Sequence, residues 1–132
     1  MRKTFHKPIR ATKTWETIRQ FMVGMGVYWD SNAERQYFHN VLCNLLSKPE
    51  IIIKPIPLEI EGGTYRPDFQ VIFSDNSEYY VEVKGSESPM WRRTRKQLRE
   101  RYPSLRLLIV FGRADKKRGF VTTKQEWLNE IT

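Results

Sequence analysis

The sequence predicts a single α/β domain in which helices flank a mixed central sheet. On either side of Asn76 the chain alternates apolar and polar residues, which is the pattern of strands with one covered face. Segments 31–47 and 89–102 instead carry apolar residues at helical spacing. A chain of 132 residues with 39% hydrophobic residues fits one domain and can bury a substantial core.

The first expected helix covers about residues 31–47. Ser31 is a good N-cap, and the apolar residues that follow at helical spacing are Tyr37, Phe38, Val41, Leu42, Leu45 and Leu46. Glu34 stands at the start of this apolar stripe, so we expect its carboxylate to point at the sheet. Ser31 and Glu34 also have the spacing of a capping box, which accounts for a glutamate at this position without another role. The two roles are compatible.

Three strands are expected next, at about residues 51–60, 65–73 and 78–84. The first contains the run Ile51-Ile52-Ile53, and the other two are separated by a turn around Asn76-Ser77. Consecutive strands joined by short turns pair as an antiparallel meander.

A basic helix is expected at about residues 89–102, followed by an apolar strand at 105–111. Trp91, Leu98 and Tyr102 recur at helical spacing and supply the packing stripe of the helix. A helix between two strands of this kind is typical of a parallel crossover, so one parallel strand should join the meander.

The core is expected to span about residues 27–111, with less regular segments on both sides. Residues 1–26 are expected to form a basic N-terminal extension, in which the apolar spacing of 14–25 indicates an extra helix or a subunit contact. Residues 112–132 are expected to close the domain, ending in a short helix that contains Trp127, Leu128 and Ile131.

The candidate site residues on the strands are Asp68, Glu82 and Lys84. In paired strands all three polar side chains fall on one face, while Val81 and Val83 point to the other. Mg²⁺ takes oxygen ligands and keeps several waters, so one or two carboxylates with a phosphate oxygen suffice to hold it. Such an ion polarises a phosphoryl group, and a nearby ammonium offsets the charge that builds on it. The alternative is an exposed Glu–Lys pair on a strand, which is common.

The charge of the chain predicts a polyanionic partner. The formal net charge is +8 and the isoelectric point is about 9.8. The cations are densest in the second helix, where the candidate phosphate contacts are Arg92, Arg93, Arg95, Lys96 and Arg99. The same sign recurs further along, at Arg106, Arg113, Lys116, Lys117 and Arg118. For the helix taken alone, the alternative to phosphate binding is that these cations lie on an ordinary solvent-exposed helix face.

A helix glutamate, then Pro67-Asp68, then Glu82-Val83-Lys84, in this order of helices and strands, resembles the PD-(D/E)XK nuclease superfamily. Residues 65–69 together with 81–85 are similar to its small phage-type Holliday-junction resolvases and to the end-cleaving nuclease subunit of some heteromeric transposases. The resemblance covers roughly residues 27–111. It implies a restriction-endonuclease-like core with the order α-β-β-β-α-β.

The resemblance also implies a role for each matching residue. Asp68 and Glu82 would bind Mg²⁺, or Mn²⁺ in its place, and the main-chain carbonyl of Val83 would be a further ligand. Glu34 would complete the acidic cluster, and Lys84 would be the third catalytic residue. The implied activity is hydrolysis of phosphodiester bonds in DNA.

Within this class a junction- or branch-resolving endonuclease is expected, because the chain is small and carries no separate sequence-reading segment. Cutting two strands favours a homodimer with two sites. The alternatives are a transposase- or restriction-type nuclease subunit recruited by a partner protein, and a non-catalytic nucleic-acid-binding module of the same fold. The chain departs from the Gln-x-x-x-Tyr signature of the exonuclease-like subgroup, since Gln97 is followed by Arg101 at that spacing.

Composition also suggests a compartment. With Cys43 as the single cysteine, no disulfide can form within the chain, and a reducing environment is expected. No run is apolar enough for a membrane span or a signal peptide. The expected location is the cytoplasm, with a phage or mobile element in a bacterial host as a plausible origin of the gene.

Overall fold

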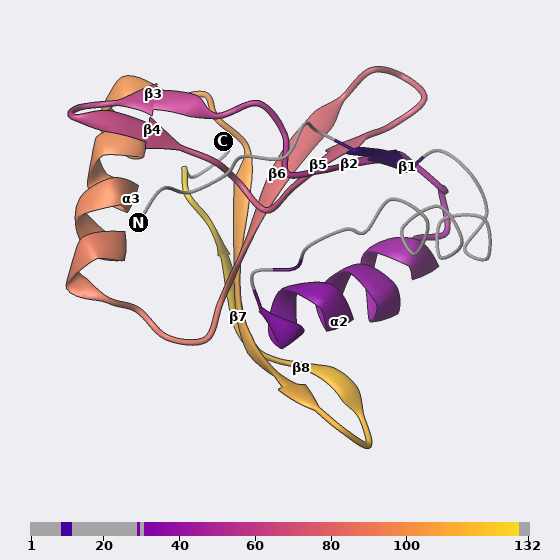
Figure 1. Ribbon diagram of the computed structural model, residues 1–132. Coiled ribbons are helices and arrows are strands. Elements are labelled where there is room, and N and C mark those ends of the chain that lie inside the picture. Colours follow the sequence, from indigo (N-terminus) through magenta and orange to yellow (C-terminus); the bar gives the residue numbers. More distant parts are fainter. Residues whose placement is uncertain (1–8, 12–28, 30, 130–132) are drawn as a thin grey trace.

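The computed structural model describes residues 9–11, 29 and 31–129, and it has an α/β architecture with helices on both faces of a mixed sheet (Figure 1). The elements in chain order are β1 (Ile9–Ala11), α2 (Asn32–Asn40), a 3₁₀ turn (Leu42–Asn44), β2 (Glu50–Ile53), β3 (Leu58–Ile60), β4 (Gly63–Tyr65), β5 (Phe69–Ile72), β6 (Glu78–Lys84), α3 (Pro89–Arg101), β7 (Leu107–Asp115) and β8 (Gly119–Trp127). None of the described helices is long and apolar enough to cross a membrane.

The main sheet has the strand order β1-β2-β5-β6-β7-β8, and β3 pairs with β4 in a separate small sheet. The predicted meander is confirmed, because β2 pairs antiparallel with β5 and β5 pairs antiparallel with β6. The predicted crossover is confirmed as well. Helix α3 connects β6 to β7, and these two strands run parallel with Glu82 opposite Ile109.

Each face of the sheet has its own core. Helix α2 packs Phe38 onto one face, against Phe69 and Val81. Helix α3 packs on the opposite face, where Trp91 and Leu98 belong to a second buried cluster. A parallel crossover places its helix over the sheet, so the polar face expected on β6 lies beneath a helix rather than in open solvent.

The first helix is shorter than predicted. It ends at Asn40, and a single 3₁₀ turn follows. The side-chain amides of Asn40 and Asn44 donate to the carbonyls of Gln36 and Asn40 at 2.9 and 2.8 Å, and the Asn40 carbonyl is one that a further helical turn would have used. Leu46, expected in the buried stripe, is 98% exposed.

The strand predicted at 51–60 is two strands, β2 and β3. Lys54, directly after β2, has a φ of 53°, a left-handed conformation that ends the extended run. Pro55 and Pro57 cannot donate to a strand ladder, so pairing resumes only at Leu58. The strand predicted at 65–73 is likewise divided into the end of β4 and β5.

At the C-terminal side the prediction of a closing helix is wrong for the described residues. Segment 119–127 is β8, which pairs antiparallel with β7, and Leu128 donates its N–H to the Leu107 carbonyl at 2.9 Å. β-Branched residues such as Val121 and Thr122 favour this extended form. Ile131 lies outside the described residues.

Within the expected N-terminal extension, residues 9–11 form β1, which pairs antiparallel with β2. This strand covers an edge that an isoleucine-rich β2 would otherwise expose. The helix or subunit contact expected at 14–25 lies outside the described residues.

Candidate metal and nucleic-acid site

Asp68 lies against the end of β6, next to Glu82. Pro67 has no N–H with which to extend the β5–β6 ladder. Asp68 donates its own N–H to the Val81 carbonyl at 3.0 Å, and its Oδ2 accepts a hydrogen bond from the Val83 N–H at 2.7 Å. The Asp68 carboxylate therefore takes the place of a strand partner and is held beside the acid of the motif.

The carbonyl of Val83 faces the same side of β6 as the Asp68 carboxylate. The N–H and C=O groups of one strand residue point to the same side, and the Val83 N–H points at Asp68. Val83 also lies beyond the last register pair of β5 and β6, which joins Phe69 to Val81. Its carbonyl thus lies on the edge of β6 that faces Asp68, and Asp68 together with Glu82 is what we define as the acid pair.

Glu82 is buried at 6% exposure, more deeply than Asp68 or Lys84. Its Oε1 accepts a hydrogen bond from the Tyr65 hydroxyl, and its Oε2 lies 3.3 Å from Lys84 Nζ. Burial, and then the charge of Asp68, raises the pKa of Glu82 well above its usual value, against smaller lowering by Lys84 and Tyr65. A cation bound between the two acids would relieve both effects.

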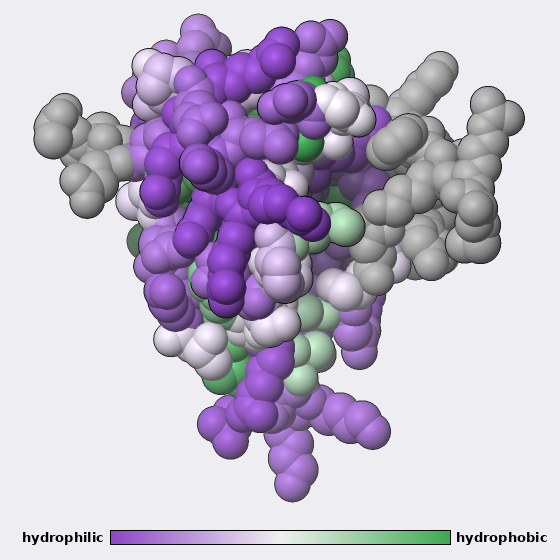
Figure 2. All heavy atoms as spheres, turned by 90° about the vertical axis from the view of Figure 1, so that its left-hand side faces the viewer, coloured by the Kyte–Doolittle hydropathy of each residue, from purple (hydrophilic) through white to green (hydrophobic). Residues whose placement is uncertain are grey.

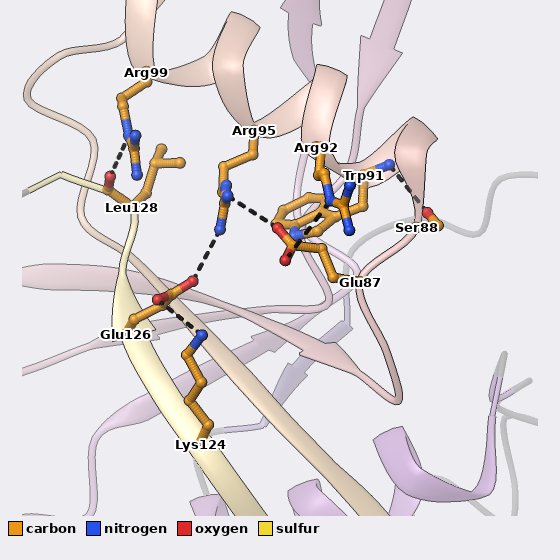
Figure 3. Close-up of polar contacts among 9 residues, drawn as sticks. All are labelled: Glu87, Ser88, Trp91, Arg92, Arg95, Arg99, Lys124, Glu126 and Leu128. Atoms are coloured by element: carbon orange, nitrogen blue, oxygen red, sulfur yellow. Dashed lines mark hydrogen bonds and ion pairs between the residues drawn. The ribbon is translucent and has the colours of Figure 1, made fainter.

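Aromatic side chains hold the site from the α3 side. The Tyr65 and Trp91 rings lie 5.8 Å apart, and Lys84 Nζ lies 4.7 Å from the centre of the Trp91 ring. Burial, followed by the charges of Glu82 and Asp68, raises the pKa of Tyr65 well above its usual value, so the hydroxyl remains a proton donor. Trp91 is held in the first turn of α3, where its main-chain N–H donates to Ser88 Oγ at 3.1 Å (Figure 3).

Glu34 occupies α2, on the other face of the sheet from α3. Its N–H donates to Ser31 Oγ at 3.0 Å, which confirms Ser31 as the N-cap. Glu34 is 2% exposed as a whole residue, and its carboxylate pairs with Lys54 Nζ at 3.6 Å. The Lys54 N–H donates to the Asp68 carbonyl at 3.0 Å, so Lys54 connects Glu34 to the main chain of the acid pair.

Among the residues that the structure describes, no three or more His, Cys, Asp or Glu side chains are grouped to hold a metal ion. Glu34 is paired with Lys54 in this structure, and its expected place in an acidic cluster with Asp68 and Glu82 stays a prediction. The acid pair still fits Mg²⁺, because this ion needs only one or two carboxylates when waters and a substrate phosphate supply the other oxygens.

Two of the five predicted phosphate contacts on α3 bind other parts of the protein (Figure 3). Arg95 is 24% exposed at its side chain and lies 2.9 Å from Glu87 Oε1 and 3.0 Å from Glu126 Oε1. Arg99 Nε donates to the Leu128 carbonyl at 2.9 Å. Both arginines attach α3 to neighbouring segments.

The other three predicted contacts are exposed. Arg92 Nε lies 3.9 Å from Glu87 Oε2, which is a loose ion pair on a largely exposed side chain. Arg93 and Lys96 are exposed and form no ion pair with any residue in the described part of the chain. The surface over α3 is accordingly strongly hydrophilic (Figure 2).

Sequence reasoning missed Tyr65, Lys54 and Trp91 as members of this site. The helical spacing of Trp91 indicates only packing, and Tyr65 stands out only as part of a family motif. Lys54 could have been found from the sequence, because a lysine directly after three isoleucines and before Pro55 indicates the end of a buried strand.

A comparison of the chain with protein-family models finds no match, and neither does a comparison with curated proteins.

Proposed function

We propose that this protein is a Mg²⁺-dependent DNA endonuclease with a restriction-endonuclease-like core. One observation carries the proposal: two carboxylates and an ammonium meet at the end of β6, where Val83 binds Asp68 and Lys84 binds Glu82. The crossover order of strands and helices is compatible with the PD-(D/E)XK nucleases that the sequence resembles.

In this proposal Asp68 and Glu82 hold the ion, with the Val83 carbonyl as a third oxygen donor. When bound, Mg²⁺, or Mn²⁺ in its place, supplies electrophilic polarisation of the phosphate and a nucleophile at neutral pH. The Lys84 ammonium, partly exposed beside Trp91, turns toward the phosphate and offsets its developing charge. Glu34 acts through Lys54, which orients the Asp68 main chain.

Burial of acids argues for catalysis rather than binding alone. A module that only binds DNA gains nothing from carboxylates near phosphate, because like charges repel. Here Glu82 is buried among a tyrosine, a lysine and a second acid inside a chain of net charge +8. The resemblance to resolvases favours branched DNA as substrate and a homodimer with two sites.

The test is cleavage of labelled four-way, flap, duplex and single-stranded DNA in Mg²⁺, Mn²⁺, Ca²⁺ or EDTA. We expect cutting in Mg²⁺ and Mn²⁺, and binding without turnover in Ca²⁺, whose coordination is larger and looser. Undiminished cutting in EDTA would refute the proposal.

Variants separate catalysis from binding in the same assay. Asp68→Ala, Glu82→Ala and Lys84→Ala should each slow cleavage by about a hundredfold or more, while the affinity of the two acid variants for DNA stays the same or rises. Glu78→Ala is the matched control, because Glu78 is an exposed acid at the opposite end of the same strand. A wild-type rate in any of the three variants would remove that residue from the site.

A further inference from the structure

The β7–β8 hairpin extends beyond the end of β6 and closes in a turn of three cations. β7 pairs Phe111 with Lys84 and then continues to Asp115. Figure 1 shows the hairpin extending past the rest of the sheet, and Figure 2 shows hydrophilic side chains at that end of the molecule. The turn residues, which we call the basic tip, are Lys116, Lys117 and Arg118, and all three are exposed.

The backbone of the basic tip is held in one conformation. Asp115 Oδ1 accepts hydrogen bonds from the N–H groups of Lys117 and Arg118 at 2.8 and 2.9 Å. Gly119 closes the turn with a φ of 75°, and a Cβ at this position would lie 2.8 Å from the side chain of Asn40. A turn ordered in advance loses little conformational entropy when it binds a ligand.

The end of the hairpin next to the basic tip is braced against α2. The Gln36 side chain donates to the Asp115 carbonyl at 3.2 Å and accepts from the Asp115 N–H at 3.1 Å. The Tyr37 and Phe120 rings meet edge to face at 5.2 Å. The hairpin is therefore supported up to its last residues.

The charges of the basic tip have no acidic partner among the described residues. Its closest acid, Asp115, is bound to main-chain N–H groups of the turn, which lower its pKa. Arg113, nearer the base, also forms no ion pair within the described part of the chain. This differs from α3, where Arg95 lies between two glutamates.

We propose that the basic tip binds the phosphate backbone of the DNA duplex beside the bond that is cut. The inference rests on the proposed function. Asp115 lies four positions after Phe111, which pairs with Lys84, and at about 3.3 Å per residue this places the start of the tip roughly 13 Å beyond Lys84. Since DNA rises about 3.4 Å per base pair, one duplex spans both points within about four base pairs. Contacts with phosphate carry no sequence information, as expected of an exposed turn of lysine and arginine.

The test compares two triple variants with the same reduction in charge. The tip variant is Lys116→Gln with Lys117→Gln and Arg118→Gln. The control is Lys48→Gln with Arg101→Gln and Arg106→Gln. These three exposed cations lie away from Lys84 and the tip: Lys48 precedes β2, Arg101 is the last residue of α3, and Arg106 precedes β7. Affinity for a labelled duplex is measured in EDTA across a series of salt concentrations.

Removing one cation that binds a phosphate should flatten the slope of log affinity against log salt by about 0.9. We expect the tip variant to flatten it by about 2 to 3, and the control by less than about 1. Equal changes in both variants would overturn the inference, because net charge alone would then explain binding. An unchanged slope in the tip variant would overturn it as well.

A single charge reversal, Lys117→Glu, keeps the turn and the contacts of the hairpin with α2, so that unfolding does not account for its effect. It should weaken binding of duplex DNA, and unchanged affinity would count against the tip. Because these measurements need no metal and no turnover, the binding of DNA by the tip and the nuclease proposal can fail separately. Loss of cleavage in Asp68→Ala reports only on the nuclease proposal.

Discussion

The hydrogen bond between Tyr65 and Glu82 leads to a stability prediction for Tyr65→Phe. The substitution keeps the ring that packs against Trp91 and removes only the hydroxyl that donates to a buried carboxylate. A hydrogen bond to a charged group contributes about 1.5–3 kcal/mol, and a buried acceptor left without its donor costs a similar amount. We expect the free energy of unfolding to fall by about 2 kcal/mol in metal-free buffer.

Mg²⁺ should reduce this destabilisation. A cation bound to Glu82 stabilises the carboxylate that Tyr65 otherwise stabilises, so the variant gains more from the metal than the wild type does. In saturating Mg²⁺ we expect the difference between the two proteins to shrink below about 1 kcal/mol. The assay is equilibrium unfolding in urea, followed by circular dichroism, in EDTA and in Mg²⁺.

Tyr80→Phe is the control for this experiment. Tyr80 lies on the same face of β6 as Glu82, and its hydroxyl makes no hydrogen bond to a residue that the structure describes. Its removal should change stability little in either buffer. An equal destabilisation by Tyr65→Phe in EDTA and Mg²⁺ would refute metal binding at Glu82, and unchanged stability in both buffers would refute the contribution of the hydrogen bond.

Two further predictions concern charge. Burial and Asp68 raise the pKa of Glu82 in the folded state, so its contribution to stability is fully present below the ordinary value of 4.5 and is lost as pH rises through the folded-state pKa. Metal-free unfolding curves across pH should show this decrease in the wild type and not in Glu82→Gln. On α3, Arg93→Gln with Lys96→Gln should flatten the salt slope of DNA binding by about 0.9 for each cation that binds a phosphate, at unchanged stability. Arg95→Gln, which breaks two ion pairs, should instead lower the free energy of unfolding. A loss of stability in the Arg93→Gln, Lys96→Gln variant, with a flatter salt slope in Arg95→Gln, would contradict these two assignments.

Local patterns were enough to predict the elements that present the candidate site. The two-residue alternation of β6 and the helical spacing in α3 are visible in the residues themselves, and both elements appear within about one residue of the predicted bounds. The same alternation placed Glu82 and Lys84 on one face of β6, and the structure pairs them.

Boundaries that depend on partners were not predictable in this way. β8 is polar over most of its length, and it is a strand because β7 supplies the backbone groups that complete its ladder. The break between β2 and β3 follows from the backbone at Lys54, which turns to donate to Asp68.

By itself, the sequence determined which residues carry the proposed chemistry and on which face of β6 they lie, because side-chain direction along a strand is a local property. Only the tertiary structure decided that Glu82 is buried on this face, since Tyr65 from β4 binds Glu82 and Trp91 from α3 packs beside Lys84. It also decided that Glu34 faces Lys54, that the β7–β8 hairpin extends beyond the sheet, and that Arg95 binds Glu126. Charge and periodicity describe a segment, whereas burial and pairing depend on which other segment packs against it.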